Sequence, residues 1–172
     1  MAPRRPAKTT DLLYRLKRWM YPAGRPNAVA RALNAVATVL HGTGLLTPPE
    51  WVTLEVVGRR SGRVVSAPLV VAEHDGERYL VAMLGESTNW VRNVRAAGGR
   101  AVLRHGRRER VRLVEVPVAE RAPILRRYLA VAPGARPHIA VDRHAPLHEL
   151  ARVAAHHPVF RVVNDEAVET AA

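Results

Sequence analysis

Two glycines and three arginines stand within the six-residue stretch GRRSGR, which lies between two apolar runs. Gly58 and Gly62 allow the backbone angles of a tight turn that exposes successive N–H groups. The guanidinium groups of Arg59 and Arg60 and the hydroxyl of Ser61 add side-chain donors, so the stretch predicts an anion site. An ordinary solvated hairpin tip has the same composition and stays open as the alternative.

A proline interrupts the apolar run VVSAPLVV that follows the turn. Because Pro68 cannot donate to a strand ladder, it predicts an edge, a bulge, or a place where a ligand replaces a neighbouring strand. Ser66 lies two residues earlier, on the same face of the predicted strand. A simple edge strand is the alternative to the ligand contact.

The stretch MLGESTNWVRNVRAAGG predicts a strand, a glycine and a capped helix. Gly85 ends the strand, and Ser87 or Thr88 can cap the helix that follows. Such a transition presents free N–H groups to an anion. Trp90 and Asn93 fall on one face of this helix, so an aromatic plane and an amide can meet the same ligand.

Trp90 also has a second interpretation. Val91 and Val94 form a competing apolar stripe on the same helix, and an aromatic side chain at helical spacing fits a core position as well as a ligand contact.

The histidines and the absent cysteines limit other chemistry. His144 and His148 are four residues apart, but no HExxH acid accompanies them, so no metal site is predicted. Cysteine is absent, which excludes disulfides and thiolate ligands. No arrangement resembling a catalytic triad occurs, and we assign no catalytic side chain.

The chain of 172 residues carries a formal net charge of +12, from 27 basic and 15 acidic residues. A field of this sign attracts nucleic acid, anionic lipid or an anionic cofactor. Eight aromatic residues (three Trp, four Tyr, one Phe) leave little for base stacking, and no recognised nucleic-acid motif occurs, so nucleic acid is not an expected partner.

The elements that must position these residues alternate between strands and helices. Apolar runs with turn residues between them predict strands at 51–57, 64–71, 78–84, 100–105, 109–116 and 158–163. Helices are predicted at 88–97, 118–131 and 145–156. The pattern indicates an α+β protein built on a small, mostly antiparallel barrel of about six strands decorated by helices.

The N-terminal part differs from the rest of the chain in composition. Residues 1–48 predict a basic tail and amphipathic helices, and residues 49–172 the barrel domain. The basic, amphipathic segment 10–21 either lies on an anionic membrane or packs on the domain. No signal peptide or membrane span is visible, so we expect a cytoplasmic protein, with peripheral contact at the inner face of the cell membrane if the first alternative holds.

The motifs GRRSG, SAPL and NWVRNVRAAGG, in this order between Leu54 and Val116, resemble the deazaflavin (F420)-dependent nitroreductase family of actinobacteria, also called F420H2-dependent quinone reductases. The resemblance implies a split β-barrel and hydride transfer from reduced F420 to a quinone-like, enone or nitro acceptor, which could be menaquinone-like. FMN is the less favoured cofactor. A non-catalytic split-barrel protein that binds deazaflavin, flavin or fatty acid is the alternative function.

The resemblance also implies a set of cofactor-binding residues: Arg59, Arg60, Ser61, Gly62, Ser66, Pro68, Leu84, Gly85, Asn89, Trp90 and Asn93. Two features depart from the family pattern. Val65 stands where relatives carry an arginine, and the loop 84–89 is shorter and lacks a lysine. Arg63, Arg92 or Arg95 could compensate. The stretch VAPGARPHIAV lacks the tyrosines of nitroimidazole-reducing relatives, which favours a quinone or enone acceptor.

Overall fold

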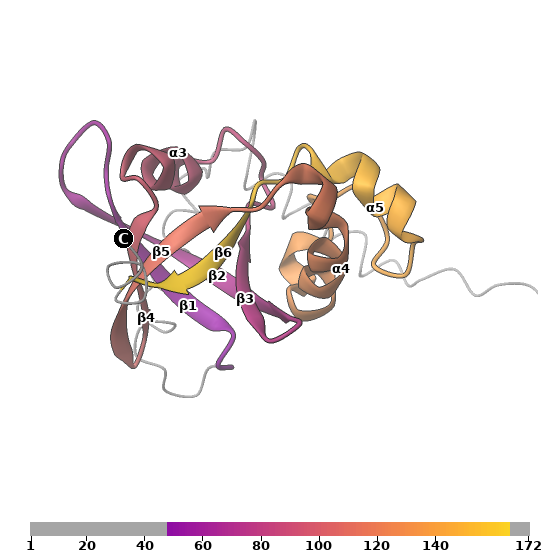
Figure 1. The fold of residues 1–172 in the computed structure, drawn as a ribbon, viewed down its shortest axis with the longest axis horizontal. Helices are drawn as coiled ribbons and strands as arrows, with labels where there is room; N and C mark the ends of the chain where they lie inside the picture. The colour runs from indigo at the N-terminus through magenta and orange to yellow at the C-terminus, as the bar shows by residue number, and fades with distance from the viewer. Residues whose placement is uncertain (1–47, 166–172) are drawn as a thin grey trace, which may run out of the picture.

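The computed structural model describes residues 48–165, which form a closed six-stranded barrel with three α-helices (Figure 1). The strands are β1 (Trp51–Val57), β2 (Val64–His74), β3 (Glu77–Val81), β4 (Arg100–His105), β5 (Arg107–Glu115) and β6 (Val159–Asn164). Their order is β1-β2-β3-β6-β5-β4, and β4 pairs again with β1. Every pair is antiparallel, which confirms the predicted barrel. The predicted N-terminal helices lie outside the described residues.

Helices cover two parts of the barrel. They are α3 (Asn89–Ala96), α4 (Arg121–Val131) and α5 (Leu147–Ala154), with short 3-10 turns η2 (Val118–Glu120) and η3 (Pro133–Ala135). Helix α3 packs near β1 at one end of the barrel, whereas α4 and α5 pack on each other beside β2 and β3 (Figure 1). All three helices occur where the sequence predicts them, with slightly shorter bounds. Within residues 48–165, no helix is long and apolar enough to cross a membrane.

Several strand ends differ from the predicted ones. Strand β3 ends at Val81 instead of residue 84, because the chain turns directly afterwards: Met83 N–H donates to Val81 O at 3.1 Å and Gly85 N–H donates to Ala82 O at 2.9 Å. Strands β2 and β5 are longer than predicted, because their hairpin turns are very short. Asp75 and Gly76 have φ angles of 50° and 77°, the geometry of a two-residue hairpin turn.

The barrel interior is filled by alternate residues of the strands. One core cluster inside the barrel includes Leu54, Leu80, Val111 and Phe160, which are at most 1% exposed, together with residues of α3. A second cluster lies between the barrel and the helices α4 and α5, and includes Leu125. The strands β2, β3 and β6 contribute consecutive residues to both clusters, which explains why continuous apolar runs predicted these strands.

Strand β2 changes partners along its length. Residues 64–70 pair with β1, whereas β3 pairs only with residues 71–74. The first half of β2 therefore has no second strand partner among residues 48–165. Pro68 lies in this half, opposite Thr53 of β1, so it interrupts no second ladder. Of the three interpretations of Pro68, the structure shows an edge position among residues 48–165, and a ligand contact there stays a prediction.

Candidate functional site

The β1–β2 turn is folded closely on itself. Gly58 N donates to Arg63 O at 2.8 Å, and Gly62 N donates to Gly58 O at 2.8 Å. A Cβ atom added at Gly58 would lie 2.8 Å from Val65 Cγ2, so this position lacks space for a side chain. Gly62 has open space around it but a φ of +65°, which favours glycine. The two glycines are thus needed for different reasons.

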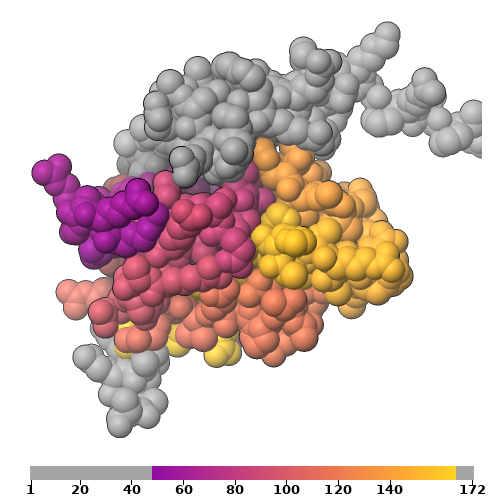
Figure 2. Space-filling model, turned by 90° about the horizontal axis from the view of Figure 1, so that it is seen from above, coloured from indigo at the N-terminus to yellow at the C-terminus, as the bar shows by residue number. Residues whose placement is uncertain are grey.

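A side chain of α3 holds this turn in place. Arg59 N and Arg59 Nη1 both donate to Asn93 Oδ1, at 3.3 Å and 2.9 Å. Asn93 is only 5% exposed, so its amide oxygen faces the turn from a buried position. In the space-filling view, the purple turn segment stands out beside the magenta surface of α3 (Figure 2). The structure therefore brings together two motifs that the sequence predicted separately.

The remaining arginines of the turn are available to a ligand. Arg60 and Arg63 are exposed, and neither guanidinium group has an acidic or hydrogen-bonding partner among residues 48–165. Ser61 Oγ accepts a hydrogen bond from Arg63 N at 3.3 Å. The turn thus presents two unpaired cations to solvent, beside backbone held in a tight reversal.

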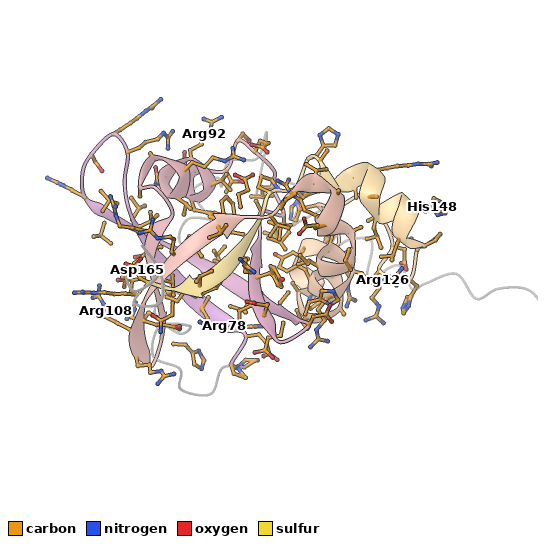
Figure 3. All side chains as sticks on the ribbon, in the orientation of Figure 1. Arg78, Arg92, Arg108, Arg126, His148 and Asp165 are labelled. Carbon is orange, nitrogen blue, oxygen red and sulfur yellow. The ribbon has the colours of Figure 1, made fainter. Side chains whose placement is uncertain are left out.

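Val65 leaves an apolar position beside these cations, since its side chain is 42% exposed. Of the three arginines that could compensate, Arg95 is excluded by ion pairs with Glu86 and Glu115. Arg92 is exposed and has no partner in the part of the chain that the structure describes; Figure 3 shows it on α3. Arg63 and Arg92 are therefore the two available substitutes.

Ser66 and Pro68 lie on one face of β2, as predicted. They pair with Glu55 and Thr53 of β1, whereas the intervening Ala67 packs against the barrel core. Both side chains consequently point away from the barrel interior.

The loop that precedes α3 rests on the C-terminal part of the barrel. Gly85 has a φ of +80°, and a Cβ atom there would lie 2.9 Å from His156 O. His157 Nδ1 hydrogen-bonds to Ala82 O at 3.2 Å. Leu84 is half-buried in the same loop. The loop backbone is thus fixed by contacts that any side chain at Gly85 would disturb.

Thr88 occupies the N-cap position of α3, one of the two predicted caps. Its hydroxyl donates to Gly85 O at 2.7 Å and makes no capping bond to the helix. Asn89, the first residue of α3, is exposed. The N-terminus of α3 is consequently without a side-chain cap.

Trp90 lies in the core. It is 7% exposed and packs edge-on against Phe160, with ring centroids 5.5 Å apart and an interplanar angle of 60°. This is the second interpretation that the sequence left open. Of the three α3 residues in the predicted cofactor set, Asn89 alone is exposed, and a cofactor contact of Trp90 stays a prediction.

An ion-pair network that the sequence did not reveal connects this region with α4. Arg95 Nη2 lies 2.7 Å from Glu115 Oε1, and Arg95 Nε also donates to Glu115. Its other contact is Glu86 of the loop, and this hydrogen bond lowers the pKa of the Glu86 carboxyl. Glu115 in turn accepts from Arg121 Nη2 at 3.1 Å. These pairs follow no periodic spacing, so no sequence signal marks them.

Arg121 is the buried member of this network, at 5% exposure. Its Nε donates to Val116 O at 2.8 Å, where β5 ends. The network thus joins the loop before α3, α3 itself, the end of β5 and the start of α4. Among residues 48–165, no three His, Asp or Glu side chains gather as a metal site would require.

Comparisons with known proteins show similar structures and the family of the chain. The chain is similar in structure to an F420-H2 dependent reductase, FDR-A (21% identity, TM-score 0.48, 66% of this chain and 94% of that one), and to an F420 reductase (17%, 0.41, 69% and 89%). A heme binding protein from Mycobacterium smegmatis is also similar (14%, 0.45, 77% and 50%). The comparison with curated proteins finds no match. The model of the F420H(2)-dependent quinone reductase family matches residues 26–149, which is more than half of the chain. The chain therefore belongs to the F420H(2)-dependent quinone reductase family.

Proposed function

We propose that this protein is a reductase that transfers a hydride from reduced F420 to a quinone-like acceptor, with enones and nitro compounds as further acceptors. Family membership supports the use of F420H2. The observation that carries the proposal is the pair of hydrogen bonds from Arg59 to Asn93, which fixes the arginine turn against α3. A fixed turn with unpaired guanidinium groups suits a ligand that carries several negative charges.

The residues present fit such an anionic cofactor. Arg60 and Arg63 are exposed and have no counter-charge among the described residues. Among residues 48–165, the first half of β2 is paired on one side alone, so Ser66 and Pro68 border a strand edge that a flat ring can approach. FMN also carries a phosphate, so the turn by itself does not exclude it.

We assign the following roles within this proposal. Arg60, with Arg63 and the backbone of the turn, binds the anionic part of the cofactor. Ser66, Pro68 and Asn89, with Leu84 and Gly85 of the loop, border the ring and orient its reactive carbon. When bound, reduced F420 supplies the hydride, and the protein binds, orients and excludes water.

The first test is a titration with oxidised F420, read as quenching of tryptophan fluorescence, with FMN in parallel. F420 should bind more tightly than FMN, and binding should weaken with salt. Arg60→Ala should weaken F420 binding about tenfold or more, because a charge-assisted contact is lost. The matched control is Arg152→Ala, which removes the same charge from an exposed position on α5. Equal loss in both variants, or tighter binding of FMN, would contradict the assignment.

The second test is turnover. Oxidation of F420H2 should be accelerated by a simple quinone such as menadione more than by an enone or a nitroaromatic compound. F420 binding without turnover of any acceptor would support the non-catalytic alternative. Binding and turnover are measured separately because the exposed Val65 stands where the family pattern has a cation.

We also propose that residues 10–21 contact an anionic membrane surface, which suits a lipid-soluble quinone. The support is the sequence pattern alone, since these residues lie outside the described part of the chain. Cosedimentation with anionic vesicles should fall in the Lys17→Glu/Arg18→Glu variant. The Arg126→Glu/Arg152→Glu variant, with the same net charge, should cosediment like the unaltered protein; equal effects would contradict the proposal.

A further inference from the structure

Arginines crowd the outer face of the β4–β5 hairpin. Leu103, Val111 and Leu113 point into the barrel and are at most 4% exposed, so their neighbours along each strand point outward. The outward side chains include five arginines, in positions 100, 104, 108, 110 and 112. Figure 3 shows Arg108 on this side of the barrel, near Asp165 and far from Arg126 of α4.

The register places like charges directly opposite each other. Arg100 pairs with Arg112, and Arg104 pairs with Arg108. Such cross-strand pairs of like charge reduce the stability of a sheet. These like-charge pairs do not stabilise the hairpin itself, which suggests that the arginines bind anionic groups.

The protein's own carboxylates neutralise part of this face. Glu55 of β1 bridges two arginines: its Oε1 lies 3.2 Å from Arg104 Nε and its Oε2 lies 2.7 Å from Arg108 Nη2. Asp165 Oδ1 lies 3.4 Å from Arg112 Nε. In the described part of the chain, Arg100 and Arg110 have no acidic partner, so two of the five guanidinium groups are left without a counter-charge.

A groove runs along this face. It has a volume of about 340 Å³, and Arg100, Arg108 and Arg110 line it together with apolar side chains. Val57 and Val64, which flank the β1–β2 turn, form its apolar wall and are 51% and 63% exposed. The groove therefore combines unpaired cations with a strip of exposed aliphatic surface.

We propose that this groove binds an extended acidic polypeptide segment. The face already binds carboxylates in this manner, because Glu55 bridges Arg104 and Arg108. Arg100 and Arg110 are diagonal neighbours on adjacent strands, about 7–8 Å apart, and can be bridged by a carboxylate that comes from another chain.

The spacing of the face also suits an extended peptide. Arginines two residues apart on one strand, such as Arg108 and Arg110, recur about every 6.6–6.8 Å, which is the spacing of alternate side chains in an extended chain. The methylene groups of glutamate can pack on Val57 and Val64. No aromatic side chain lines the groove, so it lacks the stacking platform of single-stranded nucleic-acid sites.

The test measures the fluorescence anisotropy of a labelled octaglutamate peptide titrated with the full-length protein. We expect binding that weakens as salt rises. The Arg100→Gln/Arg110→Gln variant should bind about tenfold more weakly or worse, because two guanidinium contacts are lost. The control is Arg126→Gln/Arg152→Gln, which removes the same net charge from α4 and α5, and it should bind like the unaltered protein.

Each other outcome overturns the proposal. Equal weakening in the two double variants would mean that net charge, and not this groove, attracts the peptide. Tighter binding of inorganic polyphosphate or of oligothymidylate, lost in the groove variant alone, would assign the groove to phosphates. Folding is checked by thermal unfolding: because Arg100 and Arg110 have no acidic partner among residues 48–165, the groove variant should unfold at the same temperature or higher.

Discussion

Arg59 Nη1 lies 2.9 Å from Asn93 Oδ1, a hydrogen bond that joins the β1–β2 turn to α3 across 34 positions of the sequence. The same amide oxygen also accepts from Arg59 N at 3.3 Å. One buried side chain on a helix therefore orients both the backbone and the guanidinium group of the turn. In the proposed function, Arg60 and Arg63 are therefore assigned to the anionic part of the cofactor, whereas Arg59 fixes the turn.

Replacing Asn93 separates the structural part of this contact from its electrostatic part. Asn93→Ala removes the acceptor and should lower the free energy of unfolding by about 1–3 kcal/mol, measured by urea denaturation. Asn93→Asp keeps the acceptor and pairs with Arg59, so the stability should change little. Its added negative charge should nevertheless weaken F420 binding. If Asn93→Asp binds F420 with unchanged affinity, the anion site does not lie beside α3.

The two glycines of the turn should respond differently to substitution. At Gly58, a Cβ atom would meet Ser61 Oγ at 2.9 Å and Arg63 O at 3.1 Å, so Gly58→Ala forces the turn backbone apart. Gly62→Asn places a side chain in open space, at a φ that asparagine tolerates. We expect Gly58→Ala to lower the free energy of unfolding by about 1–3 kcal/mol and Gly62→Asn by less. The reverse order in thermal or urea unfolding would show that space at Gly58 is not the limiting factor.

Substitutions of Trp90 test whether its side chain acts through packing or through contact with the ligand. Its indole packs on Phe160 inside the barrel, so Trp90→Ala should lower the free energy of unfolding by about 3–5 kcal/mol. Trp90→Phe keeps an aromatic ring there and should retain most of the stability. If Trp90→Phe binds F420 with unaltered affinity, Trp90 acts through the core. A marked loss of affinity in a stable Trp90→Phe protein would instead support a direct contact.

The stability of the protein should depend on pH through His157. Burial lowers the pKa of this imidazole below 6.5, although its hydrogen bond with Ala82 O acts in the opposite direction. The unfolded chain therefore binds the proton more readily than the folded one. Stability is fully present above about pH 6.5 and should fall as the pH drops below that value towards the lower pKa of the folded state.

Urea unfolding at a series of pH values measures this effect. His157→Gln should flatten the dependence between about pH 5 and 6.5. Hydrogen bonds from Arg95 and Arg78 lower the pKa of the Glu86 and Glu109 carboxyls. These groups therefore change the stability mainly below about pH 4.5, outside the range in which His157 titrates. A slope that survives in His157→Gln would assign it to another group.

The sequence by itself determined the elements and their approximate ends. Apolar runs bounded by turn residues predicted all six strands, because the strands bury apolar side chains in the barrel interior and, for β2, β3 and β6, also against the helices. The Asp75–Gly76 pair predicted a turn, and Pro68 predicted an edge, a bulge or a ligand contact, of which the edge is seen among residues 48–165. These features depend on residues that are neighbours in the chain, so local patterns suffice to predict them. The predicted end of β3 was wrong, because the apolar run continues to Leu84 whereas the chain turns after Val81, with Met83 N–H donating to Val81 O.

Only the tertiary structure decided which side chains meet. Spacing alone left Trp90 open between core and ligand, and the contact with Phe160 places it in the core. The family resemblance likewise left Arg95 open as a substitute for the missing cation, until its pairing with Glu86 and Glu115 excluded it. The reason is physical: a pattern reports which face of an element is buried, whereas a hydrogen bond or ion pair between distant residues exists only after the barrel has closed and set their distance.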